Sequence, residues 1–373
     1  MKRHRILVLI LCACFASAAW GQRPAGIGNN DWTQFHRLDM ERWNPYETAL
    51  SVTTVGGLRR KWAYKAAAAV FSSPAVVNGL VYVGSEDNNV YALYASSGAL
   101  LWSYATGGAV YSSPAVANGV VYVGSNDGNV YALNASTGVK LWSYTTGGPV
   151  ASSPAVVNGV AYVGGADGNV YALNASTGVL LWSYLTGNAV DSSPSVANGV
   201  VYVGSYDNNV YALNATTGAK LWSYTTADIV FSSPAVANGV VYVGSYDNNI
   251  YALKASTGAK LWSYATGSWA FSSPAVANGM VYAGSNDGNL YALNASTGVL
   301  LWSYPAGSVS SPVVANGVVY IGPNAVDAST GALLWSYPIH GLVESSPTVS
   351  NGRVYFASDD HKVYAFGLKQ SRE

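Results

Sequence analysis

A pattern of short apolar and polar stretches repeats along the chain about every 40 residues. In the unit at 112–147, Val, Tyr and Ala dominate four runs, which lie at 113–117, 120–124, 129–134 and 139–144. Asn-Gly at 118–119 separates the first two runs, Asp-Gly at 127–128 the next two, and Ser-Thr-Gly at 136–138 precedes the last. Residues of these types tolerate positive φ angles, and the first two pairs are expected to form type I′ turns. The pattern predicts a meander of four antiparallel strands.

Two recurring sequence features give the number of repeat units. A Ser-Ser-Pro triplet occurs once in each unit, with its proline at Pro74, Pro114, Pro154, Pro194, Pro234, Pro274, Pro312 and Pro347. A tryptophan occurs equally often, at Trp62, Trp102, Trp142, Trp182, Trp222, Trp262, Trp302 and Trp335. One meander cannot bury both of its faces, so neighbouring units must stack as an open solenoid or a closed ring.

The two ends of the repeat region favour the ring. The last unit has three strand-like runs but no tryptophan run, whereas 58–64 is a tryptophan run without a unit of its own. Pairing the two completes an eighth unit and removes the exposed strand edges of an open array. We therefore predict an all-β fold, an eight-bladed β-propeller at 55–368 whose N-terminal strand closes the C-terminal blade. An entry segment at 22–54 precedes it, and a tail at 369–373 follows.

The beginning of the chain is typical of a secretory signal peptide. Basic residues at 2–5 precede an apolar run, and 19–21 offers a small-x-small cleavage site. We expect 1–21 to be removed and the mature chain to be periplasmic or extracellular. No later stretch reaches the roughly 20 apolar residues of a membrane span.

Both cysteines, Cys12 and Cys14, lie in this leader. The mature chain is therefore expected to form no disulfide and to use no thiolate chemistry. The segment 11–14 also resembles a lipoprotein box, in which Cys14 would be lipidated and retained. A lipid anchor at Cys14 is thus the alternative to plain secretion.

One turn and the strand after it carry a family signature. Residues 325–335 match in full the AxDxxTGxxxW pattern of the pyrroloquinoline quinone (PQQ) type propeller repeat, and other units match it in register with one change, such as Asn134 for Asp327. The chain from about 55 to 368 thus resembles this family. The resemblance implies that the eight tryptophans are structural and pack between adjacent blades, where an indole contributes a large apolar area.

The resemblance also implies two functional branches. Quinoprotein dehydrogenases hold PQQ and Ca²⁺ on the axis and oxidise alcohols or sugars, whereas other members, such as an outer-membrane assembly lipoprotein, are non-enzymatic. Only six basic residues occur at 66–366, mature cysteines are absent, and the compact units lack the insertions that build a quinone pocket. We therefore predict a non-enzymatic scaffold with no catalytic residues and no cofactor. A PQQ-dependent dehydrogenase and a carbohydrate-binding propeller are the alternatives.

The distribution of charge along the chain disfavours one class of binding partner. Charged residues make up 10% of the chain and formally cancel, but the region 66–366 has 13 acidic residues against the six basic ones. This excess disfavours nucleic acid as a partner. Seven aspartates recur beside Gly or Asn and are interpreted as turn residues, because Ca²⁺ takes several oxygen ligands and each aspartate is usually alone. We predict no metal site and a monomeric ring that binds a protein or cell-envelope component through its loop face.

The residue before Ser-Ser varies most between units and marks a candidate site. It lies where each blade enters its innermost strand, so these residues should surround one mouth of the central channel. With the nearby Trp269, the candidate binding residues are Phe71, Tyr111, Asp191, Phe231, Trp269, Phe271 and Glu344. Asp191 and Glu344 should face each other across the axis. Aromatic rings with a few polar groups are typical of a ligand site, but the same side chains could simply plug the channel.

The seventh and eighth units are irregular. The seventh lacks two residues before Ser310 and five around 323–324, which should leave a notch in the rim. Beside the notch, and on the same face as Glu344, we expect His340, Asp359, Asp360 and His361. This sector is either a binding site or a packing adjustment at the ring closure.

Overall fold

The computed structural model describes residues 28, 30–37, 40–308 and 310–369. The predicted signal peptide at 1–21 and the lipidation of Cys14 lie outside the described residues. In the part of the chain that is described, no helix has the length and apolar composition needed to cross a membrane.

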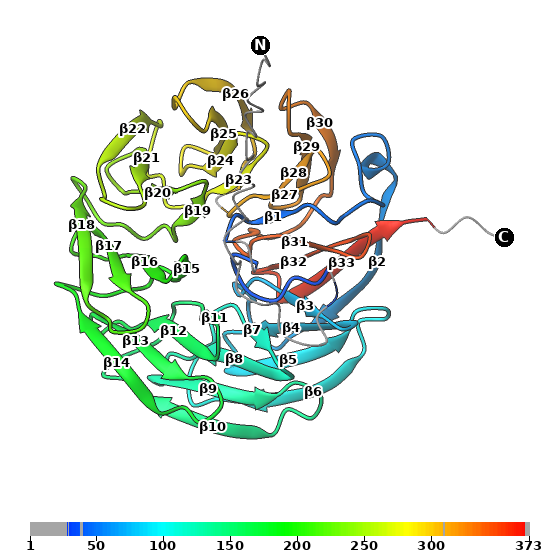
Figure 1. Cartoon of the computed structure of the whole chain (residues 1–373). Helices are drawn as coiled ribbons and strands as arrows, with labels where there is room; N and C mark the ends of the chain where they lie inside the picture. The colour runs from blue at the N-terminus through cyan, green and yellow to red at the C-terminus, as the bar shows by residue number, and fades with distance from the viewer. Residues whose placement is uncertain (1–27, 29, 38–39, 309, 370–373) are drawn as a thin grey trace, which may run out of the picture.

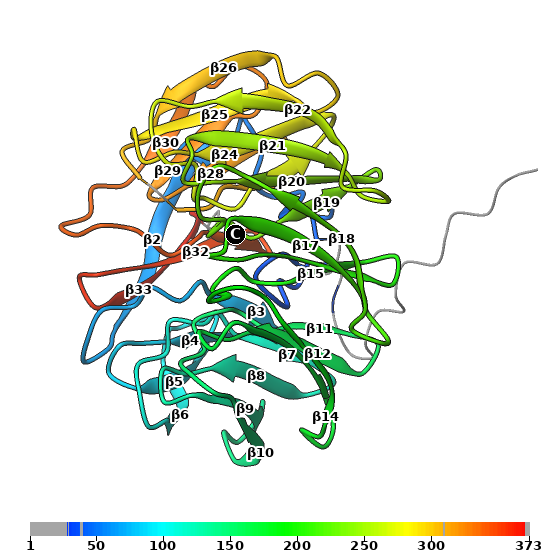
Figure 2. The ribbon, with the colours of Figure 1, turned by 90° about the vertical axis from the view of Figure 1, so that its left-hand side faces the viewer.

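Eight blades of four antiparallel strands surround a central axis, which confirms the predicted propeller, and the sheet of blade 7 has β1 as a fifth strand. Figure 1 looks along this axis, and Figure 2 views the ring from its side. Blades 1 to 7 follow chain order from β3 to β30, and blade 8 combines β31, β32, β33 and β2. The innermost strands are β3 (Ala75–Val77), β7 (Ala115–Ala117), β11 (Ala155–Val157), β15 (Ser195–Ala197), β19 (Ala235–Ala237), β23 (Ala275–Ala277), β27 (Val313–Ala315) and β31 (Thr348–Ser350).

The remaining strands lie progressively further from the axis. The second strands are β4 (Leu80–Gly84), β8 (Val120–Gly124), β12 (Val160–Gly164), β16 (Val200–Gly204), β20 (Val240–Gly244), β24 (Met280–Gly284), β28 (Val318–Ile321) and β32 (Arg353–Ser358). The third strands are β5 (Asn89–Tyr94), β9 (Asn129–Asn134), β13 (Asn169–Asn174), β17 (Asn209–Asn214), β21 (Asn249–Lys254), β25 (Asn289–Asn294), β29 (Asn324–Asp327) and β33 (Lys362–Leu368). The outer strands are β6 (Leu100–Ala105), β10 (Lys140–Thr145), β14 (Leu180–Leu185), β18 (Lys220–Thr225), β22 (Lys260–Ala265), β26 (Leu300–Pro305), β30 (Leu333–Ser336) and β2 (Leu58–Lys65).

The ring closes as the chain ends predict. After a short 3₁₀ turn, η1 (Val55–Gly57), strand β2 pairs antiparallel with β33, from Leu58 opposite Leu368 to Lys65 opposite Lys362. The second and third strands of each blade are buried on both faces because neighbouring blades cover them. This two-sided burial explains why their sequences are almost continuously apolar.

The tryptophans join adjacent blades, which confirms their predicted packing. Each of the first seven indole Nε1 atoms donates to the carbonyl of an alanine in the next blade, as Trp102 does to Ala135 at 2.9 Å, and Trp335 donates to Leu58 at 3.3 Å. The turn glycine of the next blade lies against the indole: a Cβ on Gly138 would come within 2.7 Å of Trp102. Glycine is required there both for this approach and for its φ of 72°.

The turn prediction holds for the first hairpin of each blade and is wrong for the second. Asn118 and Gly119 both have positive φ, 50° and 76°, as a type I′ turn requires. At the second hairpin only Gly128 has a positive φ, 83°. Its N–H donates to the carbonyl of Ser125, so Asp127 keeps an ordinary φ and its side chain serves a different purpose, described below.

The entry segment does more than precede the ring, because it crosses the channel. Strand β1 (Trp43–Asn44) pairs in parallel with β27, and Trp32 forms an antiparallel bridge with Val76 of β3. Between these points, carbonyls of the segment accept N–H groups from further inner strands, including Thr33 from Val116 at 2.7 Å. Figure 1 shows this blue segment across the centre of the ring. One end of the channel is thus covered by the chain itself.

Candidate binding site at the channel mouth

The second serine of every Ser-Ser-Pro triplet joins one blade to the next. Its backbone N–H donates to the hydroxyl oxygen of the equivalent serine in the following blade, over 2.8–3.2 Å. These bonds return to their starting point and form a closed ring of eight serines: Ser73, Ser113, Ser153, Ser193, Ser233, Ser273, Ser311 and Ser346. We call this set the serine ring. It surrounds the channel below the mouth and holds the inner strands at fixed spacing.

The first serine of the triplet works inside its own blade. Its hydroxyl accepts the N–H of the residue that ends the second strand, as Ser152 accepts from Gly164 at 3.0 Å. Both serines are buried, so each hydroxyl satisfies a backbone donor that water does not reach. Sequence analysis used the triplet only as a marker and missed these roles, although its presence in all eight units was a signal.

The repeated aspartates of the second hairpins are fixed by protein donors. The carboxylate of Asp127 accepts Tyr131 Oη at 2.7 Å, Asn129 N at 2.9 Å and, from the incoming connection, Gly107 N at 2.6 Å. Partial burial raises the pKa of Asp127, but these hydrogen bonds outweigh burial and hold its pKa below the usual value. The interpretation of these residues as turn aspartates is confirmed, and the tyrosine contact is an addition to it.

Aromatic side chains form an arc over blades 4 to 6 at the mouth. Phe231 and Phe271 lie 6.2 Å apart, and Tyr246 lies about as close to each of them. Tyr246 also stacks on Trp269 at 4.9 Å with an angle of 3° between the rings, while Trp269 remains 47% exposed. We call these four residues, with Tyr206 beside Phe231, the aromatic arc.

Two members of the aromatic arc escaped sequence analysis. Tyr206 and Tyr246 occupy the hairpin position where other blades have Glu86, Asn126 or Ala166. Their variation from blade to blade was the available signal. A second, smaller aromatic pair lies over blades 1 and 2, where Phe71 and Tyr111 are 5.9 Å apart.

Acidic side chains are concentrated on the other side of the mouth. Burial raises the pKa of Glu344, and the negative charges of Asp359 and Glu86 raise it further. Glu86 itself accepts Tyr111 Oη at 2.7 Å. The ring order places Asp191 of blade 4 opposite Glu344 of blade 8, as expected, and Figure 1 shows the two blades on opposite sides. Burial also raises the pKa of Asp191, partly offset by its hydrogen bond with Tyr206.

A hollow of about 270 Å³ opens where blade 7 is shortened. It is lined by residues of three blades: Phe271, Asn286, Gly307, Ser308, Leu342, Val343 and Glu344. Blade 7 has Ser308 where its neighbours have longer connections, and its hairpin at 321–324 has no counterpart of the Asn-Asp pair of blade 6. The missing atoms leave the space. Of the predicted mouth residues, the structure brings Phe271 and Glu344 together in this hollow.

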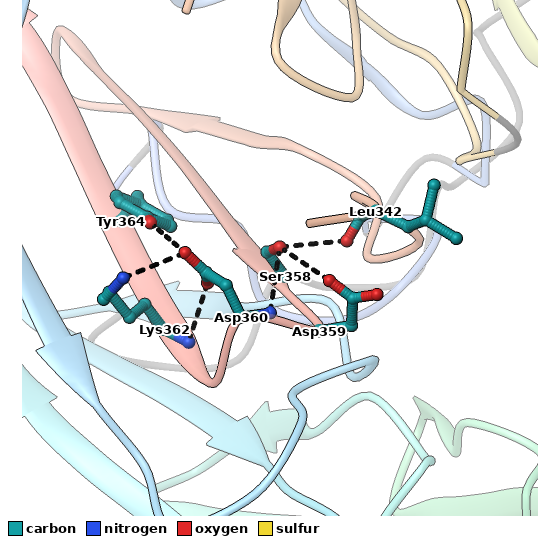
Figure 3. Close-up of polar contacts among 6 residues, drawn as sticks. All are labelled: Leu342, Ser358, Asp359, Asp360, Lys362 and Tyr364. Atoms are coloured by element: carbon teal, nitrogen blue, oxygen red, sulfur yellow. Dashed lines mark hydrogen bonds and ion pairs between the residues drawn. The ribbon is translucent and has the colours of Figure 1, made fainter. Parts of the chain in front are cut away.

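The predicted irregular sector separates into different roles. Figure 3 shows that the neighbouring aspartates diverge. Asp360 accepts Lys362 Nζ at 3.0 Å and also bonds to Tyr364 Oη, which makes it another hairpin aspartate. Asp359 lies instead on the side of Leu342, next to the hollow, with its N–H donating to the Leu342 carbonyl at 3.2 Å.

The two histidines do not join a cluster with these aspartates. His361 has a φ of 69° and occupies the left-handed turn position that Asn88 and Gly128 take in other blades. His340 is exposed on the connection into blade 8. Among the described residues, His, Cys, Asp and Glu side chains form no group of three or more that could hold a metal ion.

The floor of the channel contains a buried cation that sequence analysis also missed. Arg42 Nη1 donates to the Phe35 carbonyl at 2.7 Å, Nε to the Pro312 carbonyl at 2.9 Å, and its guanidinium lies 4.4 Å from the Phe35 ring centroid. Burial lowers the pKa of Arg42 to about 9. The group therefore fastens the entry segment to blade 7 and is directed at carbonyls rather than at the mouth.

Comparison with known proteins places this geometry in a family. The family model described as "Outer membrane protein assembly factor BamB" matches residues 32–184, 145–231, 226–324 and 308–372. The chain belongs to this family. No curated protein sequence matches the chain.

Solved structures share the fold of this BamB family member. BamB from Moraxella catarrhalis has a TM-score of 0.71 at 19% identity, covering 83% of this chain and 100% of that one. The computationally designed Ika8 protein has a TM-score of 0.73 at 21% identity, covering 82% and 98%. A quinohemoprotein alcohol dehydrogenase, ADHIIG from Pseudomonas putida HK5, has a TM-score of 0.79 at 19% identity, covering 92% and 81%. At these identities the similarity shows the fold alone.

The lining of the hollow does not fit an anionic quinone such as PQQ. PQQ is an anion with several carboxylates, which calls for cationic side chains around it. The hollow contains the Glu344 carboxylate, and no basic residue in the described part of the chain lines it. Lys140, Lys220 and Lys260 begin outer strands and are exposed.

Proposed function

We propose that this chain is a non-enzymatic scaffold that holds a protein or cell-envelope partner against the face of the ring bearing the channel mouth. The observation that carries the proposal is the family match, whose overlapping segments run from residue 32 to residue 372 and so include all eight blades. A ring fastened by the serine ring and the tryptophan contacts presents its loops in fixed positions. Little ordering is then lost when a partner binds.

The mouth face has the composition of an interface. Trp269 is 47% exposed, Tyr111 36% and Leu342 60%, and these residues lie beside carboxylates that provide polar contacts. Exposed tryptophan and tyrosine side chains are typical of the residues that contribute most to protein binding. The acidic excess of the blades supports a protein partner over nucleic acid. We further propose that the mature chain acts as a monomeric ring in the periplasm or outside the cell.

Site-specific photocrosslinking in the native envelope tests the proposal. A photoreactive phenylalanine analogue at position 269 or 111 should yield a discrete crosslinked product. The matched control is position 137, which is exposed in a turn on the opposite face. Crosslinks of equal yield from all three positions, or from position 137 alone, contradict a partner on the mouth face.

The enzymatic alternative needs a separate measurement. Purified mature chain is mixed with PQQ and Ca²⁺, and quinone uptake and dye-linked oxidation of alcohols and sugars are recorded. Stoichiometric uptake together with oxidation would show that the chain is a dehydrogenase. A glycan array, in the same way, separates the scaffold from a carbohydrate-binding propeller.

A further inference from the structure

The hollow at the mouth combines an aromatic ring and a carboxylate from two blades that flank the shortened one. Phe271 and Asn286 come from blade 6, and Leu342 and Glu344 from the connection into blade 8. Its volume is about 270 Å³. A small ligand or a single side chain fits such a space, whereas drug-sized ligands occupy pockets from about 300 Å³ upward.

The carboxylate in this hollow lacks a positive partner. Glu344 forms no hydrogen bond or ion pair with the residues that the structure describes. Asp359 and Glu86 add negative charge close by, which together with burial raises the pKa of Glu344. Glu344 is exposed at the edge of the hollow, and the three carboxylates together create a negative potential at the mouth.

The aromatic wall is held in place from behind. Phe231 and Tyr246 both approach Phe271 edge to face, with interplanar angles of 78° and 62°. Tyr246 is in turn fixed by its stacking on Trp269. A ring that neighbours hold in this way offers a preformed surface, and a cation placed over an aromatic face is attracted by the ring's negative π-system.

The remaining lining distinguishes an organic cation from a metal ion. Ca²⁺ takes six to eight oxygen ligands. The hollow offers the Glu344 carboxylate and the Asn286 amide, while Ser308 Oγ already donates to the Val343 carbonyl at 3.0 Å. The other described side chains that line the hollow, Phe271, Leu342 and Val343, are apolar. An ammonium group with alkyl substituents can contact both the polar and the apolar side chains of the hollow, whereas a metal ion can contact only the polar ones.

We propose that the hollow lined by Phe271, Asn286 and Glu344 is a binding site for a small organic ammonium group. The Glu344 carboxylate is its counter-charge, the Phe271 ring contacts its alkyl substituents, and Asn286 orients it. The site goes beyond the scaffold role and does not depend on it.

Isothermal titration calorimetry of the full mature chain tests the site. Choline serves as a free quaternary amine, and Nα-acetyllysine amide represents a lysine side chain of a protein. Saturable binding of either cation at one site is expected, and the tighter of the two identifies the source of the ammonium group. Dimethylbutanol, the uncharged carbon isostere of choline, should bind more weakly by roughly fivefold or more, because it lacks the cation–π and ionic contacts.

Variants separate the hollow from the rest of the mouth. E344Q and F271L should each weaken cation binding by roughly fivefold. The matched control is D228N, which removes a carboxylate on the connection into blade 5, outside the lining of the hollow, and should leave affinity unchanged. Circular dichroism confirms that each variant is folded.

Three results overturn the proposal: no saturable binding of either cation, equal binding of choline and dimethylbutanol, or affinities unaffected by E344Q. None of these results bears on the crosslinking of a partner from position 111, which lies over blade 2.

Discussion

The serine ring makes a quantitative prediction for stability. Replacing Ser153 with alanine removes the hydroxyl that accepts the N–H of Ser113 at 2.9 Å. Both serines are buried, at 6% and 5% exposure, so water does not replace the lost acceptor. A buried donor left without its partner costs about 1–3 kcal/mol. We therefore expect S153A to lower the free energy of unfolding by that amount.

Urea unfolding followed by tryptophan fluorescence measures this change, because the tryptophans lie between the blades. The midpoint should fall while the slope of free energy against urea stays constant, since the surface exposed on unfolding is unaltered. S143A on strand β10 is the control: Ser143 is exposed, and its replacement should shift stability by no more than about 0.5 kcal/mol. If S153A costs no more than S143A, the serine ring does not hold the blades together and the reasoning is wrong.

The second serine of another blade should contribute to stability as Ser153 does. Two further predictions concern a histidine and an aspartate. S346A, far from Ser153 in the ring order, should add its own similar cost in the double variant, which the same urea titration measures. H361G should stabilise the fold by about 1 kcal/mol, because His361 has a φ of 69° that glycine adopts without strain; a lower melting temperature would contradict this. Acid should destabilise the ring: hydrogen bonds hold the pKa of Asp127, and likewise of Asp87, Asp167, Asp207 and Asp287, below the usual value of 3.8, so their contribution is complete above that pH and is lost as pH falls through the lowered pKa. A D127N variant should show a smaller loss of stability on acidification, and an equal loss would count against the role of this carboxylate.

The architecture could be predicted from the sequence because the same short sequence pattern of strands and turns repeats eight times. The Asn118-Gly119 pair forms its turn through contacts within a few residues, so a turn predicted for one unit applies to the equivalent position of the others. The pairing of β2 with β33 was predictable for a related reason, since each end of the repeat region lacked what the other supplied. One local inference failed at Asp127-Gly128, where a long-range bond from the Gly107 N–H to the Asp127 carboxylate accompanies a different turn.

The site was predictable only in part. The variable position before Ser-Ser predicts Phe71, Phe231, Phe271 and Glu344 at one mouth, because equivalent positions of repeated units must lie at equivalent places around the ring, and the structure brings Phe271 and Glu344 together in the hollow. Which side chains would contact one another at the mouth was not predictable. Tyr206 and Tyr246 enter the aromatic arc from a different hairpin, and which acids approach Glu344 depends on where Asp359 turns.

By itself, the sequence determined the number of blades, their strand order and the closure of the ring, because these follow from local turns and from repetition in register. Only the tertiary structure decided that the entry segment crosses the channel, that Arg42 is buried in its floor, and that the shortened blade 7 leaves a hollow between Phe271 and Glu344. These features occur once in the chain. Their positions result from packing between segments as far apart as residues 42 and 312, and no periodic pattern records such contacts.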